Sequence, residues 1–212
     1  MKQLGKINDP VYHEHSNYGP IDRFALSLIQ DKRDIPFIKF LLLIHLTVLP
    51  VTILLFTPVL NGVYWWLVAI PYFLYTQFYL KGRFGLMFHC MCHRKTFKAR
   101  YQPILHNYVT WIICPLFGHA PEGYYSHHVG MHHLENNMEE DTSSTLKYQR
   151  DSLWGFLAYF SDFMINGVVD TLKYLKRKNR RKMYLRFMAG EFLYLIFCIV
   201  IAFVNLKFAL FI

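Results

Sequence analysis

Three long apolar runs restrict the fold of this chain more than any other feature of its sequence. They cover residues 36–56, 63–80 and 187–210. A helix of about 20 residues, rising about 1.5 Å per residue, crosses a hydrocarbon core of roughly 30 Å. In lipid, backbone N–H and C=O groups must be bonded within the protein, so such runs cross as helices. Hydrophobic residues make up 54% of the chain, and we predict an all-α integral membrane protein.

The first two runs are joined by a short uncharged connector, residues 57–62, and are expected to form a transmembrane helical hairpin. Residues 81–107 then contain six lysines and arginines and no acidic residue. Basic residues next to membrane spans mark the cytosolic side. We therefore place the N-terminus in the cytosol, and the connector and the C-terminus on the opposite face after a third span.

The polar residues 1–35 are predicted to be a cytosolic lead-in, with a short helix at 21–30. No apolar core follows the first residues, so they are not read as a signal peptide. Residues 36–212 are predicted to be one membrane domain. Within it, the apolar segment 108–118 is too short to cross, and it is expected to dip into the membrane and return to the same side.

Two further segments are predicted to lie at the membrane surface. Residues 153–170 are apolar but carry Asp162 and Asn166 and have basic flanks, which favours an amphipathic helix in the interface. Residues 172–186 hold eight lysines and arginines. They are either a platform for an acyl-CoA phosphate or a cluster that binds anionic lipid. Because the basic residues of this chain, whose net charge is +9, lie beside apolar runs, nucleic acid is not an expected partner.

Histidines are concentrated between residues 89 and 133, which hold eight of the eleven in the chain. Neutral imidazole is the commonest protein metal ligand, and residues four apart on an α-helix lie on one face. His89 and His93, in F-H-C-M-C-H, have this spacing. His128 and His132, in S-H-H-V-G-M-H-H, have it too. His133 lies about 100° further round the helix and is expected to point toward a second metal.

The other histidines are given weaker or ordinary roles. His119 and His127 are possible additional metal ligands, with the alternative that each is a hydrogen-bonded polar residue. His106 is expected at the surface or behind the ligands. Hydrogen-bonded side chains without a metal role are expected at His13, His15 and His45.

A donor set made almost entirely of nitrogen favours iron, zinc, copper or nickel over calcium or magnesium. Cys90 and Cys92 lie inside the first cluster, which raises the alternative of a mixed Cys/His zinc site. Their C-x-C spacing differs from the paired knuckles of structural zinc sites. A metalloprotease is excluded because H-E-x-x-H needs glutamate after the first histidine, and position 90 is cysteine.

Four acidic residues follow the second cluster. Ligating histidines usually donate their other N–H to a carboxylate or carbonyl, so one or more of the four are expected to orient imidazoles. The alternative is that they cap and solvate a loop. They are Glu135, Glu139, Glu140 and Asp141.

These two clusters resemble the histidine boxes of the membrane-bound fatty-acid desaturase and hydroxylase superfamily. His89 and His93 match its first box, H-x₃₋₄-H. In G-H-A-P-E-G-Y-Y-S-H-H-V-G-M-H-H-L-E-N-N, the residues His128, His132 and His133 match its second box as H-x₃-H-H. The resemblance covers about residues 36–212.

The resemblance implies two irons held by imidazoles, which activate O₂ and remove hydrogen from an unactivated methylene of a lipid acyl chain. It implies a desaturase-type oxidoreductase of the endoplasmic reticulum membrane, with its histidines facing the cytosol. The substrate would be a lipid or acyl-CoA. Electrons would come from an external donor such as a b-type cytochrome or a ferredoxin.

Three functions stay open: a desaturase, a hydroxylase of the same superfamily, and a non-catalytic membrane protein that keeps two of three boxes. The family pattern has a third histidine box, and no histidine follows His133 here. We therefore expect this 212-residue chain to be the N-terminal portion of a desaturase-like protein, with little activity by itself.

Overall fold

The structure, a computed structural model, describes residues 17–211. In that range it is helical and contains no β-strand; one isolated bridge joins Ile29 and Phe97. The predicted all-α class is confirmed for this part of the chain. The predictions for His13 and His15 lie outside the described residues.

The helices follow one another with few long loops. In chain order they are α1 (Pro20–Leu28), η1 (Lys32–Asp34), α2 (Ile35–Phe56), α3 (Gly62–Leu74), the π-helix η2 (Tyr75–Leu80), α4 (Lys81–His93), α5 (Gln102–Tyr108), the π-helix η3 (Val109–Ile113), η4 (Cys114–Phe117), α6 (Gly123–His127), the π-helix η5 (His128–His132), α7 (His133–Glu135), α8 (Leu153–Arg177), α9 (Arg181–Val204) and α10 (Leu206–Ala209). The helix expected at residues 21–30 is α1.

Two helical stretches in the described part of the chain are long and apolar enough to cross a membrane, Lys32–Phe56 and Arg181–Val204. They coincide with the first and third predicted spans. The second predicted span, residues 63–80, lies within α3 and η2, and its crossing stays a prediction. Large apolar side chains such as Phe78, which is 80% exposed, and Phe203, which is 88% exposed, face outward. Extensive exposed apolar surface is typical of a protein that contacts lipid.

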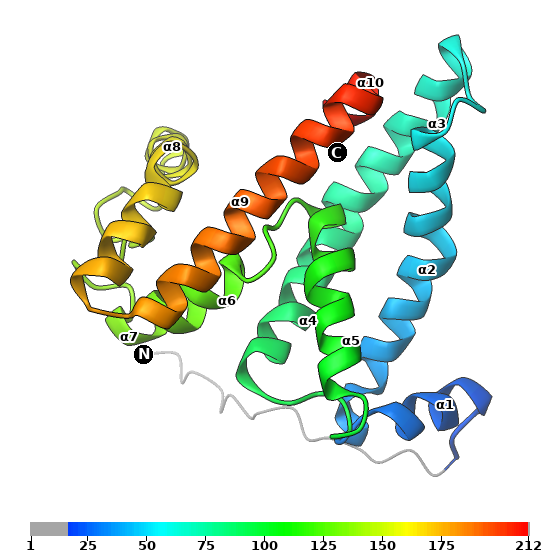
Figure 1. Cartoon of the computed structure of the whole chain (residues 1–212), viewed down its shortest axis with the longest axis horizontal. Helices are drawn as coiled ribbons and strands as arrows, with labels where there is room; N and C mark the ends of the chain where they lie inside the picture. The colour runs from blue at the N-terminus through cyan, green and yellow to red at the C-terminus, as the bar shows by residue number, and fades with distance from the viewer. Residues whose placement is uncertain (1–16, 212) are drawn as a thin grey trace, which may run out of the picture.

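Helices α2 and α3 form the predicted hairpin (Figure 1). The indole Nε1 of Trp65 donates to the Leu55 carbonyl at 2.9 Å, and the hydroxyls of Thr52 and Tyr72 are 2.8 Å apart. These bonds satisfy polar groups that lipid could not. Beyond α3 the chain continues without a break through η2 into α4, so the hairpin leads directly to the first histidine pair.

The histidine-bearing helices lie toward one end of the helical bundle. Figure 1 shows α1, the end of α4 and α7 toward that end, and the connector between α2 and α3, together with α10, toward the other. The predicted orientation requires this separation. Which end faces the cytosol stays a prediction from the distribution of charge.

The chain from α5 through η4 is continuously helical and ends at Gly118, which has a left-handed φ of 72°. Figure 1 shows it rising beside α2 and then turning back toward α6. The predicted return of segment 108–118 to the side of the first histidine pair is therefore present in the fold. Its depth in a bilayer stays a prediction.

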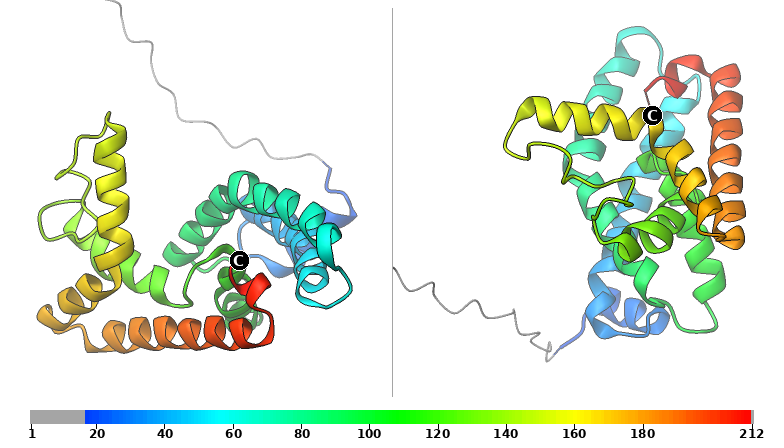
Figure 2. Two further views of the ribbon diagram at one scale, coloured as in Figure 1. Left: turned by 90° about the horizontal axis from the view of Figure 1, so that it is seen from above. Right: turned by 90° about the vertical axis from the view of Figure 1, so that its left-hand side faces the viewer.

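Helix α8 runs across the direction of α9 (Figure 2). It presents apolar side chains to the outside, including Trp154, which is 79% exposed. An outward apolar face agrees with the predicted amphipathic helix, whose place in the interface stays a prediction. In the first half of α9, Gly190 allows this helix to pack closely on the loop before α6, because a Cβ there would lie 1.7 Å from the Pro121 carbonyl oxygen.

The buried side chains form two separate cores. The larger joins α1, α2, α3, α4 and α5 and their connections. The smaller contains Met131, Tyr174, Leu175 and Phe187. It lies where residues 126–133, which we call the second histidine segment, meet the end of α8 and the start of α9. The two histidine clusters are therefore supported by different cores.

The lead-in also fixes the loop that follows the first cluster. The Gln30 N–H donates to the Thr96 carbonyl at 3.0 Å, and the Lys98 N–H donates to the Leu28 carbonyl at 2.8 Å. Arg94, the residue after His93, donates to the carboxylate of Asp34, which is fully buried. Residues 17–35 thus hold the end of α4 in place. The predicted domain boundary near residue 35 stays a prediction.

Candidate metal centre

The first histidine pair lies on a regular helix. Helix α4 buries Phe84, Met87, Phe88 and Met91 in the larger core. His89 and His93 lie one turn apart on another side of the helix, with ring centroids 4.8 Å apart. The predicted pairing on the α-helical period is present here.

The second histidine segment departs from that period. Residues 128–132 form the π-helix η5, in which hydrogen bonds run from residue i to i+5. This winding makes residues five apart neighbours, so His128 is paired with His133. Their Nε2 atoms are 2.9 Å apart. The sequence pattern had placed His128 with His132 and turned His133 away, and the structure differs because it contains this π-turn.

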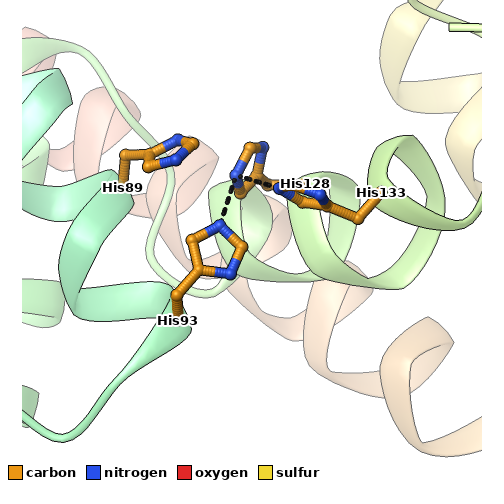
Figure 3. Close-up of side chains that lie close together, drawn as sticks. All are labelled: His89, His93, His128 and His133. Carbon is orange, nitrogen blue, oxygen red and sulfur yellow. Dashed lines mark hydrogen bonds between the residues drawn. The ribbon is translucent and has the colours of Figure 1, made fainter. Parts of the chain in front are cut away.

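Four imidazoles converge from the two helices (Figure 3). His89 and His93 come from α4, and His128 and His133 come from η5 and α7. One nitrogen from each ring lies within 4.8 Å of the others. His128 lies between two partners: its Nε2 is 3.1 Å from Nε2 of His93 and 2.9 Å from Nε2 of His133. We call these four residues the four-histidine group.

The spacing of these nitrogens fits shared coordination. Imidazole nitrogens bind zinc at about 2.0–2.1 Å, so two of them on one ion of similar size lie about 2.9 Å apart at a right angle and about 3.3 Å apart in a tetrahedron. The separations of 2.9 and 3.1 Å agree with those values. His93, His128 and His133 are thus spaced as ligands of one ion would be, and His89 completes a group that could hold a metal ion.

Electrostatics keep the group ready for a cation. Burial, together with the neighbouring His89, His133, His93 and His132, lowers the pKa of His128 to about 4. Burial, together with His133 and His89, also lowers the pKa of His93. A lowered pKa keeps an imidazole neutral near pH 7, and only the neutral ring has a lone pair for a metal.

His132 lies beside the four-histidine group with a carboxylate of its own. Its ring centroid is 5.8 Å from that of His128 and 5.9 Å from that of His133. Its Nδ1 is 2.6 Å from Oδ2 of Asp141. Burial raises the pKa of Asp141, but hydrogen bonds from Ser143 and His132 outweigh it, and the net shift lowers the pKa. The ligand role of His132 stays a prediction.

His127 and His119, the two possible additional ligands, lie outside the four-histidine group. Nδ1 of His127 is 3.4 Å from the Thr171 hydroxyl. Burial lowers the pKa of His127 to about 4, with Asp141 opposing this shift. His119 packs against the rings of Phe84 and Tyr124. Burial, together with Lys81, lowers its pKa.

His45, expected to be an ordinary hydrogen-bonded residue, and His106, expected at the surface or behind the ligands, lie outside the four-histidine group. Nδ1 of His45 donates to the Leu41 carbonyl at 2.6 Å, and Nε2 accepts from the Tyr108 hydroxyl at 2.7 Å. This is the hydrogen-bonded role expected of it. His106 is half-buried, and burial lowers its pKa.

The cysteines and the remaining acidic residues stay outside the four-histidine group. Burial, together with Glu122, raises the pKa of Cys92 to about 12, which keeps a thiol rather than a metal-binding thiolate. Glu135 and Glu140 form ion pairs with Lys178 at the end of α8. Of the acids that follow the second cluster, Asp141 therefore contacts a histidine, while Glu135 and Glu140 neutralise part of the basic segment.

One residue that contacts the group was not predicted from the sequence. The ring of Tyr124 stacks on His128, with centroids 5.2 Å apart. The two residues are four apart along the chain, so helical spacing could have suggested this contact.

These features define a helical protein of the membrane type, with imidazoles from two helices gathered into a site that could hold a metal ion. A family model described as fatty acid desaturase matches residues 64–212. This is more than half of the chain, and the chain belongs to the fatty acid desaturase family. No curated protein and no solved structure matched it in the comparisons.

Proposed function

We propose that this protein is a fatty acyl desaturase that uses histidine-ligated iron, O₂ and electrons from an external donor. The observation that carries the proposal is the convergence of His89, His93, His128 and His133 within 4.8 Å in a chain of the fatty acid desaturase family. Imidazole suits iron, zinc, copper and nickel alike. Family membership favours iron, and two irons are the number we propose for a complete site.

The bound iron would supply the O₂ chemistry that no amino-acid side chain can perform. In the overall reaction two hydrogens leave adjacent methylenes as a double bond forms. Together with two protons and two electrons from the donor, they reduce O₂ to two water molecules. The protein's own contribution is to hold the ions through neutral imidazoles and to present the acyl chain.

Two cavities support an acyl-chain substrate. The first, of about 430 Å³, is largely apolar and lies between α2, the segment from η3 to η4, and α9. The second, of about 280 Å³, lies between α6, α8 and α9 and is lined by His119, Tyr124 and His127. Tyr194 lines both, so the two cavities adjoin.

The second cavity reaches the four-histidine group through one side chain. Tyr124 forms part of its wall and stacks on His128. An apolar chain that enters between the lipid-exposed helices could therefore extend toward the proposed metal site. We propose this path as the substrate channel. An acyl chain with a photoreactive diazirine should label residues 111–121 and 193–197 in membranes, and labelling confined to other helices would contradict the channel.

Iron content tests the metal. The chain is purified in detergent after iron-replete expression, and its metals are measured by elemental analysis beside the variant His128→Ala. We expect iron in the parent chain and a large loss in the variant. Zinc at full occupancy, with no iron, would refute the proposal.

Lipid analysis tests the reaction. Because no histidine follows His133, cells that express the 212-residue chain are compared with cells that express any longer product of the same gene. A new double bond in the fatty acid methyl esters supports the desaturase. A new hydroxyl group supports the hydroxylase. An unchanged lipid profile from every iron-loaded product supports the non-catalytic alternative.

The same proposal places the protein in a membrane, as a multi-pass protein with its histidines toward the cytosol. Glycosylation tagging of the connector, residues 57–62, tests the orientation. We expect a tag there to be modified in the endoplasmic reticulum lumen. An unmodified tag, with modification of one placed in residues 94–101, would reverse the assignment.

A further inference from the structure

A buried carboxylate stands directly behind the second histidine segment. Asp141 has no exposed surface. Its Oδ2 lies 2.6 Å from Nδ1 of His132 and accepts the Asn137 N–H at 3.0 Å. Its Oδ1 accepts the Ser143 N–H at 2.8 Å and the Ser143 hydroxyl at 2.6 Å. Four groups from three residues thus surround one carboxylate.

The number of groups that donate to Asp141 decides whether the proton between Asp141 and His132 lies on the carboxyl group or on the ring. The two backbone N–H groups and the Ser143 hydroxyl all donate, and a carboxylate that accepts several hydrogen bonds is favoured over the neutral acid. A carboxylate has no proton to give. The proton between Asp141 and His132 is therefore on Nδ1 of His132, which leaves the lone pair of the neutral ring on Nε2.

The loop that carries Asp141 is built around these bonds. Asn136 and Asn137 adopt left-handed φ angles of 49° and 60°, which reverse the chain after α7. Asn137 then holds residues 144–145, where the loop returns: its Oδ1 accepts the Thr145 N–H at 2.9 Å, and its carbonyl accepts the Ser144 hydroxyl at 2.7 Å. The position of the carboxylate is thus fixed by hydrogen bonds within the loop.

We propose that Asp141 is a positioning residue that holds His132 with its proton on Nδ1, so that Nε2 can bind a metal ion beside His128 and His133. The inference rests on the proposed metal site and adds a residue that acts through a ligand. The inference also explains how His132 could act as a ligand, although His132 lies outside the four-histidine group. A carboxylate behind a ligating imidazole fixes the tautomer and ring orientation.

The first test observes the tautomer without metal. The metal-free chain, labelled with ¹⁵N-histidine, is studied by NMR in detergent, and the His132 signals are assigned by their loss in His132→Asn. At a pH at which the His132 ring is neutral, we expect the pattern of a ring protonated at Nδ1. A ring protonated at Nε2 would overturn the inference, whatever the chain binds.

The second test measures Co²⁺ binding to the same metal-free chain by its absorption bands. In Asp141→Asn, the amide can donate its N–H to Nδ1 of His132 and so move the ring proton to Nε2. We expect the affinity to fall by about 10- to 100-fold, the usual loss for residues behind a ligand. The matched control is Glu139→Gln, which removes one negative charge from an exposed position in the same loop and should leave the affinity unchanged.

A milder variant keeps the test informative if Asp141→Asn does not fold. Ser143→Ala removes the hydroxyl that donates to Oδ1 but keeps the backbone donors, and we expect a loss of a few fold. Equal affinity in all variants, with tight binding by the parent chain, would overturn the positioning role and leave the proposed metal site intact. A parent chain that binds no Co²⁺ would instead refute the metal site.

Discussion

The two histidine clusters each contribute two imidazoles to the four-histidine group, but they lie on different local structures. His89 and His93 lie on a regular α-helix whose other side is buried in the larger core. His128 and His133 lie on a π-turn followed by a single helical turn, above a core of four buried residues. The first cluster is supported by apolar packing. The second is supported by a small core and by the polar cage around Asp141.

The difference matters because a metal site needs ligands from both clusters in one place. A regular helix sets the spacing of its side chains by its own hydrogen bonds. A π-turn is rare and is commonly found at functional sites. Here it brings residues five apart in sequence to the same partner. The second cluster should therefore be the more sensitive of the two to changes in its surroundings.

The largest expected effect comes from the residue shared by the two clusters. His128→Ala removes the ring that contacts both His93 and His133. We expect metal affinity to fall by more than about 100-fold, beyond the 10- to 100-fold typical of residues behind a ligand. Calorimetric or absorption titration measures it. His45→Gln, on α2 and away from the site, is the control, and an equal loss in both would contradict the shared role.

The next effect compares the two cores. Met131→Ala and Met87→Ala each empty a buried position, 0% and 2% exposed, and each should cost about 2–5 kcal/mol. Only Met131→Ala should also weaken metal binding strongly, because Met131 lies within the π-turn and its core is small. Unfolding in detergent and metal titration give the two readouts. Met138→Ala, which is 60% exposed, controls for the loss of a methionine.

The pH dependence of stability should come mainly from the second cluster. Burial lowers the pKa of His127 and of His128 to about 4, below the value of about 6.5 for an unfolded chain. Between these values the unfolded state binds more protons, so the free energy of unfolding falls as the pH falls from about 6.5 to 4. The loss is roughly 3 kcal/mol per residue at most.

Unfolding of the metal-free chain at pH 7 and pH 4.5 measures this loss. His127→Gln should remove part of the dependence because glutamine does not titrate. A parent chain whose stability is the same at both pH values would show that these rings are not held neutral.

The smallest expected effect concerns the support of the first cluster. Arg94→Gln removes the guanidinium that donates to the buried Asp34, and an unpaired buried acceptor costs about 1–3 kcal/mol. We expect this loss of stability with little change in metal affinity, because the other bonds to residues 17–35 and the packing of α4 in the larger core still hold the helix. Lys95→Gln, at the exposed neighbouring position, should change neither. A large loss of metal in Arg94→Gln would show that the first cluster also depends on its surroundings.

Much of the fold followed from the sequence because its signals are local and repeated. Apolar runs predicted both stretches of the described residues that are long and apolar enough to cross a membrane, and they predicted the hairpin of α2 and α3. The position of His89 and His93 on one face of α4 followed from the α-helical period. The family was identified from the residues of the two boxes, and a family model over residues 64–212 confirms it.

The pairing inside the second cluster was decided by tertiary structure. The α-helical period predicted His128 with His132, and the structure pairs His128 with His133. The π-turn that causes this contains Gly130, where a Cβ would lie 2.4 Å from the Met183 sulfur of α9. Contact between segments distant in sequence surrounds this turn, and no periodicity within the segment contains that information.

The sequence by itself determined that the chain is helical, apolar enough for a membrane, and rich in metal-binding side chains in two places. Only the folded chain decided which four imidazoles meet, that Asp141 rather than Glu135 or Glu140 contacts a histidine, and that Tyr124 joins a cavity to His128. The physical reason is the sequence separation of the residues that interact. Helix formation and hydrophobic periodicity depend on neighbours within a few residues, whereas a site built from two helices depends on how separate cores place them.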